Sequence, residues 1–379
     1  MTDLVLRVPA KVVYGSDVFH RAADEAARYG HRVLVVTESS LHDYDLPERL
    51  RRMLRERGLQ AVLFDEIGEV GGTSTVNRVV SLARAAHAQV IIGFGGMRAL
   101  AIARAAALAA PQENGFHRIL SGQRDVDTML PYIEVPTVFR NHFLLKDFFV
   151  ITEQSGRAAR VLRTPEELVR TVLFDPKLTV TMTNKSTAAT MMDTLLAACE
   201  GYLSPRSNFL SDTLFLRSVD TLKVSIDGMA KSPDDLDHRY HAADAGLLCA
   251  VGLSMSNQGA GGALTYAINS RFRVPKAWAA AILLPHILDF HAEMKPAKVA
   301  KIARALGEDI PGLSNTDDAA QASTVARRLI GKLGLPGRLR DFELTLDGLA
   351  EASSVAASLD IPGYDGSEDE LYELVRQAF

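Results

Sequence analysis

The stretch QVIIGFGGMRALAIARAAALAA, residues 89–110, decides the fold of this chain. Residues 90–94 are apolar or small, as in a buried strand, and Gly95 and Gly96 then interrupt the run before an alanine-rich helical segment. A strand that passes through a glycine turn into a helix often binds the phosphates of a dinucleotide, because backbone N–H groups at the helix start reach the phosphate. The turn continues with a methionine and Arg98, where small or hydroxylic residues would fit best.

The rest of the first half alternates apolar runs with helical patterns. Apolar runs occur at 32–37, 61–67, 132–138 and 148–152, and a helical pattern extends from 45 to 58. Strands that alternate with helices at this spacing indicate parallel βαβ units. Serine is favoured at the N-cap of a helix, so we predict helix N-caps at Ser16 and near Ser74.

The pattern changes after the apolar run at 172–180. From Asn184 onward the sequence is almost wholly typical of helix, with breaks at Pro205, Pro233, Pro275 and Pro311. We therefore predict an α/β domain at 1–180 and an all-helical domain at 181–379. The predicted fold class is a Rossmann-like parallel sheet followed by a helical C-terminal domain.

Composition and charge exclude several classes of protein. The chain is 47% hydrophobic and 23% charged, and its formal net charge of −4 gives no basic surface for nucleic acid or an anionic membrane. No apolar run reaches the roughly 20 residues that span a bilayer, and no signal-peptide pattern is seen. The two cysteines, Cys199 and Cys249, suggest neither a disulfide framework nor a metal cluster. We expect a cytoplasmic protein with no nucleic-acid or membrane partner.

Several spaced strings carry a resemblance to a known family. They are VVYGSD (12–17), VIIGFGGMRALAIARAAA (90–107), VPTVFRNHFL (135–144), FDPKLT (174–179), MMDTLLAACEGYLS (191–204) and VPKAWAAAILLPHI (274–287). Over essentially its whole length the chain resembles the iron-containing alcohol dehydrogenase family, which includes the maleylacetate reductases. The resemblance implies a dehydroquinate synthase-like fold with a cleft between the two domains. There a divalent metal, usually iron or zinc, polarises the alcohol oxygen while hydride moves to NAD or NADP.

The metal ligands of the family are largely missing from this sequence. Residue by residue, the family's Asp ligand is kept as Asp193, but its three His ligands are replaced by Ala197, Gly262 and Lys276. A further active-site His of many members is replaced by Tyr266. Alanine and glycine have no donor atom, a protonated lysine is a poor ligand, and a catalytic divalent ion typically has three protein ligands. We therefore expect no metal.

Lys276 is the candidate for the role that the metal has in the family. A metal stabilises the alkoxide-like oxygen during hydride transfer, and an ammonium group can supply part of that stabilisation in a dry site. We predict that Lys276 acts as a charge stabiliser or as an acid/base group beside Asp193, with Tyr266 and His142 as further candidate catalytic residues. In the alternative interpretation, Lys276 and Asp193 form only an ion pair that fills the former metal site.

The dinucleotide site keeps part of the family pattern. Gly95 and Gly96 keep the turn, but the family's serine is replaced by Arg98 and its helix lysine by Arg104. In the second loop, the run 138–143 replaces small hydroxylic residues with bulky ones, which could fill the nucleotide pocket.

Other residues favour a working site. Thr137 begins the second loop as in the family, and Arg98 and Arg140 could bind phosphates as charged forks. Glu38, which follows the strand at 32–37, is placed to accept the ribose hydroxyls and to disfavour a 2′-phosphate. We therefore predict NAD rather than NADP. Alternatively, these charged residues are surface or interdomain groups.

The leading hypothesis is a metal-independent, NAD-linked oxidoreductase that acts on a hydroxy or carbonyl substrate. A specialised form is a biosynthetic tailoring step on a small molecule or modified peptide, in which a β-hydroxy acid is oxidised and then loses carbon dioxide. Lys276, Arg140 and His142 would then hold the carboxylate. The alternatives are a non-redox enzyme or a non-catalytic binding protein on the same scaffold. A homodimer is expected only through the resemblance.

Overall fold

The chain divides into two compact units, Val8–Met182 and Thr183–Phe379. The division lies two residues after the predicted boundary at residue 180. The structure is a computed structural model and describes residues 6, 8, 10–68, 72–113, 115–120, 128–153, 158–308, 314–361 and 366–379.

The first unit contains a six-stranded sheet in the order β1-β8-β5-β4-β2-β3. Every neighbouring pair is parallel, which confirms the predicted Rossmann-like sheet. The strands are β1 (Lys11–Tyr14), β2 (Arg32–Thr37), β3 (Gln60–Phe64), β4 (Val90–Gly95), β5 (Tyr132–Pro136) and β8 (Val169–Phe174). The central strands β4 and β5 are buried along their whole length, as expected when helices cover both faces of a parallel sheet.

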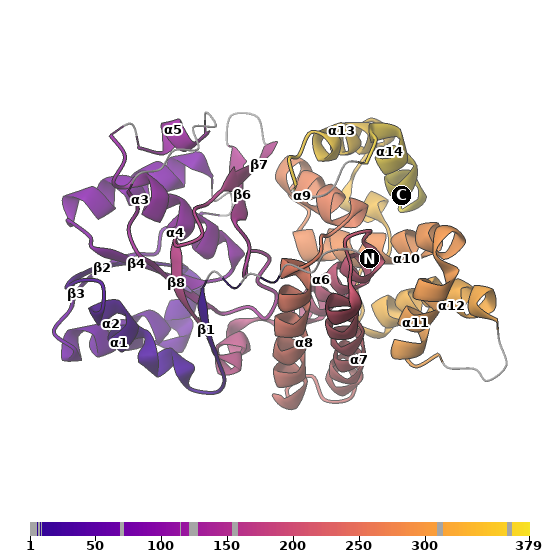
Figure 1. Cartoon of the computed structure of the whole chain (residues 1–379), viewed down its shortest axis with the longest axis horizontal. Helices are drawn as coiled ribbons and strands as arrows, with labels where there is room; N and C mark the ends of the chain where they lie inside the picture. The colour runs from indigo at the N-terminus through magenta and orange to yellow at the C-terminus, as the bar shows by residue number, and fades with distance from the viewer. Residues whose placement is uncertain are drawn as a thin grey trace. The chain divides into compact units, whose positions relative to one another are not determined.

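Helices cover both faces of this sheet (Figure 1). On one face lie α1 (Ala22–Ala27) and α2 (Leu46–Glu56), and on the other lie α3 (Thr73–Ala85), α4 (Met97–Ala109) and α5 (Gly115–Leu120). The neighbouring strands β2 and β4 therefore lead to helices on opposite faces, β2 to α2 and β4 to α4. Ligands of open α/β sheets bind at such a switch point, beyond the carboxyl ends of the strands.

Three local predictions in this unit are wrong. The apolar run at 148–152 forms β6 (Phe148–Glu153), which pairs antiparallel with β7 (Ala158–Arg163) in a separate two-stranded sheet. A parallel strand needs a crossover connection, usually a helix, and no helix lies between β5 and β6. Ser16 is not a cap: the chain enters the short 3₁₀ helix Val18–Arg21 through Asp17, whose φ is 65°. Helix α3 begins after Gly72, earlier than the predicted cap near Ser74.

The second unit is helical, as predicted, and has no strand among its described residues. Its helices are α6 (Asn184–Leu203), α7 (Phe209–Lys231), α8 (Asp237–Ser254), α9 (Ala260–Phe272), α10 (Lys276–Met294), α11 (Pro296–Ala305), α12 (Asn315–Lys332), α13 (Leu346–Ala357) and α14 (Glu368–Gln377). The predicted breaks at Pro205, Pro233 and Pro275 fall between helices, whereas Pro311 lies outside the described residues. None of the described helices combines the length and apolar character that crossing a bilayer requires.

Helix α6 is held from one side by a close three-helix contact. Phe215 of α7 is fully buried, and its ring lies against Gly201 of α6 and Gly252 of α8. A Cβ atom built on Gly252 would lie 2.6 Å from Phe215 Cε1, and one built on Gly201 would also collide with the ring. The absence of side chains at these two positions therefore lets the three helices approach.

Helix α6 also fixes the start of α9 through a buried carboxylate. Glu200 accepts the backbone N–H groups of Gly261 at 2.6 Å and Gly262 at 3.0 Å. These N–H groups lie in the first turn of a helix, where no intrahelical acceptor is available. Burial is the main influence on the pKa of Glu200 and raises it to about 7, although the backbone N–H groups act in the opposite direction.

We expect substitutions at two helical glycines to have opposite effects on stability. Gly252→Ala should lower the free energy of unfolding by about 1–3 kcal/mol, because its methyl group overpacks against Phe215. Gly331→Ala in α12 is the control, because nothing lies within 4 Å of its added Cβ, and it should raise the same quantity by about 0.5–1 kcal/mol. Urea denaturation measures both, and equal effects of the two changes would contradict this packing.

A second prediction concerns the pH dependence of folding. The folded protein binds a proton at Glu200 more tightly than the unfolded chain, because the pKa rises from 4.5 to about 7. The free energy of unfolding should therefore fall as the pH rises from about 4.5 to about 7, by at most ~3 kcal/mol from this residue. Glu200→Gln has no charge to bury and should flatten the slope, measured by urea denaturation across this range. A variant with the wild-type slope would show that Glu200 is not the titrating group.

Candidate functional site

The glycine turn between β4 and α4 has a geometry that only glycine fits. Gly95 has a φ of 149°, which L side chains rarely adopt. A Cβ atom added there would also lie 3.1 Å from the Ala99 Cβ atom. Gly96 precedes α4 and has no side chain with which to cap the helix start. The first backbone N–H groups of α4 therefore form a suitable binding site for an anion.

Glu38 lies directly over this turn. It follows β2, the neighbour of β4, and a Cβ atom built on Gly96 would lie 3.2 Å from Glu38 Oε1. The structure thus brings together Glu38, Gly95 and Gly96 at the switch point of the sheet. Arg98, in the first turn of α4, is exposed and donates from Nη1 to the carbonyl of Gly68 at 3.1 Å.

The second loop begins at the same turn. The Thr137 N–H group donates to the Gly95 carbonyl at 3.0 Å, and the Thr137 side chain is buried. Arg140 is also buried, with an exposed fraction of 2%, and its Nη1 donates to the carbonyl of Asn141 at 3.4 Å. Its predicted role as a phosphate ligand stays a prediction. His142 is half-buried, and its ring meets Phe143 edge-on at 6.1 Å.

Phe143 packs into the α/β unit. Its ring meets Phe149 of β6 edge-on at 6.4 Å, and the guanidinium carbon of Arg104 lies 5.8 Å from its centre. These contacts account for one of the bulky residues in the run 138–143, because they hold its ring against a strand and a helix of this unit.

A pocket lies at the same sheet edge, on the side of α2. Its apolar wall includes Tyr44, Leu46 and Leu178, which follow the carboxyl ends of β2 and β8. Titratable residues also line it, among them Lys177 and Asp17, which form an ion pair at 2.6 Å. The pocket therefore combines an apolar wall with charged groups, next to the segment that carries Glu38.

In the helical unit, the half-buried Lys276 forms an ion pair with the buried Asp193. Lys276 begins α10, Asp193 lies in the middle of α6, and their Nζ and Oδ1 atoms are 2.8 Å apart. The exposed fractions of the two side chains are 10% and 2%. Lys276 Nζ also lies 4.9 Å from the ring centre of Tyr266 in α9. Both contacts stabilise the charged ammonium form of Lys276.

Positions 197 and 262, which the resemblance matches to metal ligands, provide no donor atom. Ala197 is fully buried one turn after Asp193, and a Cβ atom built on Gly262 would lie 2.7 Å from Gln258 Cγ. The Gln258 side chain thus occupies the space that a larger residue at 262 would need. Among the described residues, no group of three or more His, Cys, Asp or Glu side chains could hold a metal ion.

Sequence reasoning missed several residues that the structure places at these sites. Glu134 accepts hydrogen bonds from Arg104 and from Asn141 beside the second loop, and Gln258 lies against Gly262. A charged residue inside an apolar strand, as in YIEVP, was the available signal for Glu134, because buried charges need partners.

Trp278 lies two residues after Lys276 in α10. Its ring centre is 4.2 Å from the Nζ atom of the exposed Lys185 and 5.4 Å from the ring of Phe342, which it meets edge-on. These contacts account for its half-buried position by packing within the helical unit.

Two family models match most of the chain. Residues 9–176 match the model described as iron-containing alcohol dehydrogenase. Residues 187–373 match the model described as Fe-containing alcohol dehydrogenase family, C-terminal.

Relatives and solved structures agree with these matches. The chain is 25% identical to a 1,3-propanediol dehydrogenase of Klebsiella pneumoniae over 355 residues, covering 92% of each chain. It is 27% identical to maleylacetate reductase 2 of Cupriavidus pinatubonensis over 305 residues, covering 80% of this chain and 78% of the relative. The crystal structure of a 1,3-propanediol oxidoreductase has the same fold, with a TM-score of 0.91, 24% identity and complete coverage of both chains. The chain therefore belongs to the iron-containing alcohol dehydrogenase family of oxidoreductases.

Proposed function

We propose that this protein is an NAD-linked alcohol dehydrogenase in which the ammonium group of Lys276 has the role of the family's metal. The observation that carries the proposal is the Lys276–Asp193 ion pair, which lies at two former ligand positions. It places a half-buried positive charge beside the Asp193 carboxylate in the helical unit.

The residues present do not fit a catalytic divalent ion. Asp193 is the one donor kept at the four former ligand positions, and its Oδ1 atom accepts a hydrogen bond from Lys276. Ala197 and Gly262 have no donor atom. An ion that entered beside Asp193 would also meet the like charge of Lys276, which adds an electrostatic cost to the missing ligands.

The ion pair can still perform the electrostatic part of the reaction. NAD would supply the hydride acceptor for oxidation of the carbinol carbon, the hydroxyl proton would pass to water, and negative charge would develop on the substrate oxygen. Lys276 Nζ donates a hydrogen bond to Asp193 Oδ1, and the positive charge of its ammonium group would stabilise the negative charge on that oxygen. Asp193 would orient the ammonium group and keep it charged. The contacts of Lys276 therefore favour charge stabilisation over the role of a general base.

The α/β unit supplies a fitting place for NAD. The pyrophosphate would bind at the N–H groups that begin α4, and Glu38 would accept the adenosine ribose hydroxyls beside the turn. Tyr44 and Leu46, which follow Glu38 in the sequence, line a pocket together with Leu178, and this pocket could bind the adenine. The Glu38 carboxylate would repel a 2′-phosphate, which supports NAD over NADP. Thr137, Arg98 and Arg140 are the further candidate contacts.

We propose that the substrate is a hydroxy or carbonyl compound. The specialised candidate is a β-hydroxy acid, either a small molecule or part of a modified peptide. Its carboxylate would need a cation, and Arg140, His142 and Lys276 are the candidates that the sequence offers. We further propose a cytoplasmic enzyme, and a homodimer on the grounds of family membership alone.

The first test of this function measures nucleotide binding. We expect wild-type protein to bind NADH, followed by isothermal titration calorimetry, with at least about tenfold preference over NADPH. Glu38→Gln removes the charge that repels a 2′-phosphate, so the preference should shrink mainly through tighter NADPH binding. Glu66→Gln, an exposed carboxylate of the same unit paired with Arg78, is the control and should keep the preference. Absence of any nucleotide binding at millimolar concentration would refute the proposal.

The second test separates the ammonium group from a metal. Lys276→Gln keeps a donor for Asp193 but removes the positive charge, so we expect kcat to fall at least about 100-fold while the Kd for NADH is unchanged. Lys185→Gln, which changes an exposed lysine of the same unit, should leave both values near wild type. NADH formation at 340 nm with 1,3-propanediol and with 3-hydroxybutanoate gives the rates.

Elemental analysis of the same preparation tests the metal directly. We expect substoichiometric iron and zinc, and full activity after dialysis against EDTA. One equivalent of either metal, or unchanged turnover in Lys276→Gln, would leave the ion pair as a structural filling of the former metal site.

A further inference from the structure

The α/β unit contains a fully buried ion pair beside the candidate nucleotide site. Arg104 lies in α4 and Glu134 in β5, and the exposed fractions of their side chains are 1% and 0%. Arg104 Nε and Nη2 both lie 3.0 Å from Glu134 Oε2. Neither charge could remain buried without the other, because an uncompensated ion in a protein interior is strongly unfavourable.

The pair is bonded directly to the end of the second loop. Arg104 Nη2 donates to the carbonyl of Phe143 at 3.0 Å. The other oxygen of Glu134, Oε1, accepts from the Asn141 amide, and Asn141 Oδ1 in turn accepts the Phe143 N–H group at 3.1 Å. Both backbone polar groups of Phe143 are therefore held, one by the cation and one through the anion.

The start of the loop is held by the nucleotide turn itself. The N–H group of Thr137 donates to the Gly95 carbonyl. The segment 137–143 is thus fixed at one end by the turn after β4 and at the other by α4 and β5. Thr137 lies at the first anchor, and Arg140 and His142 lie between the two, so the conformation of the loop determines the positions of all three residues.

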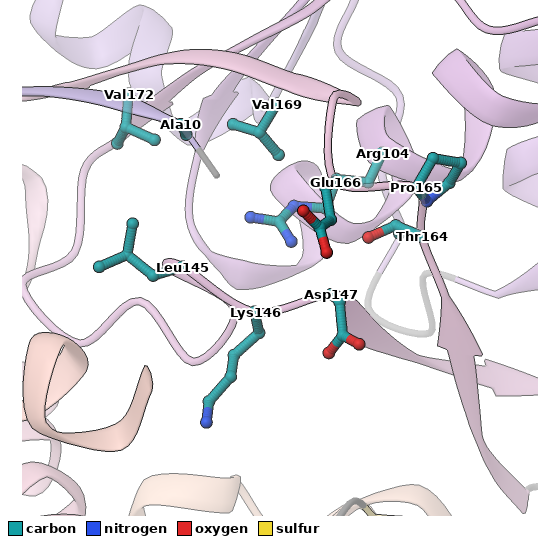
Figure 2. Close-up of a pocket in the computed structure, with 10 residues that line it drawn as sticks. All are labelled: Ala10, Arg104, Leu145, Lys146, Asp147, Thr164, Pro165, Glu166, Val169 and Val172. Atoms are coloured by element: carbon teal, nitrogen blue, oxygen red, sulfur yellow. The ribbon is translucent and has the colours of Figure 1, made fainter. Parts of the chain in front are cut away.

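Figure 2 shows the surroundings of the guanidinium group, which include Val169 and Val172 of β8. Arg104 lines a cavity of about 10 Å³ together with Leu145, Lys146, Asp147 and Glu166, which is near the space that one water molecule needs. Among the described residues, Arg104 Nη1 has no hydrogen-bond partner. The guanidinium group is therefore enclosed by helix, strand and loop, and one bound water would complete its hydrogen bonds.

We propose that Arg104 and Glu134 are positioning residues of the dinucleotide site. Their ion pair orders the loop 137–143 before any ligand binds, and this order gives the site its affinity for the nucleotide. The proposal rests on the NAD-binding function proposed above. Preordering raises affinity because binding then spends no free energy on fixing the loop.

The test replaces both members of the pair together. Arg104→Met with Glu134→Leu leaves no unpaired charge, and apolar pairs of similar size often replace buried ion pairs without loss of stability. Lys11→Met with Glu25→Leu is the matched control, because Lys11 and the buried Glu25 form a 2.7 Å pair elsewhere in the unit. Each protein is examined by amide hydrogen exchange without ligand, by NADH titration and by thermal unfolding.

We expect the Phe143 amide of the Arg104/Glu134 variant to exchange at least about tenfold faster than in wild type. Its Kd for NADH should rise at least about tenfold, whereas the control variant should keep the wild-type exchange of this amide and the wild-type Kd. Faster exchange with an unchanged Kd would overturn the positioning role. Unchanged exchange would overturn the ordering of the loop.

A single substitution covers the case in which the double variant does not fold. Arg104→Lys keeps the charge, but one ammonium group cannot reproduce the fork that joins Glu134 to the Phe143 carbonyl. Its exchange rate and Kd should therefore both rise above wild type, and wild-type values for both would reject the proposal. If wild-type protein itself fails to bind NADH, the proposed function fails, while exchange of the Phe143 amide still decides whether the pair orders the loop.

Discussion

A carboxylate with 2% of its surface exposed needs a cation, and in the helical unit Lys276 meets that need for Asp193. The two residues come from different helices, so the pair also fixes the start of α10 against the middle of α6. A divalent ion held by one Asp and three His would bind four side chains. The ammonium group instead carries a single charge, so its influence on a reacting oxygen depends on how well water is excluded.

The α/β unit follows the same rule at another position of the family pattern. Arg104, which the resemblance matches to a lysine of the family, is paired with Glu134 of β5, and the pair is bonded to the second loop. The second loop and the buried ion pair are therefore in direct contact. The Phe143 ring packs beside the Arg104 guanidinium group, and the Phe143 carbonyl accepts a hydrogen bond from it. Substitutions that look separate in the sequence form one contact network in the structure.

The sequence was sufficient for the parallel sheet and the helical second unit, because hydrophobic period and glycine turns are local signals. It was also sufficient for the contact between Lys276 and Asp193, but only through residue-by-residue resemblance, since 83 residues separate them. The hairpin of β6 and β7 was missed because an apolar run does not reveal its pairing partner. The burial of Arg140 was missed because a charged side chain in a loop is usually solvated, and tertiary packing decides the exception.

Trp278 gives the helical unit an optical property of its own. It is the only tryptophan of the chain, and it stands two residues from Lys276 with a lysine ammonium over its ring. Indole emission responds to nearby charge, so the tryptophan fluorescence of the protein originates two residues along the chain from the candidate catalytic amine. The chain thus carries a single native indole label, and it lies in the helical unit.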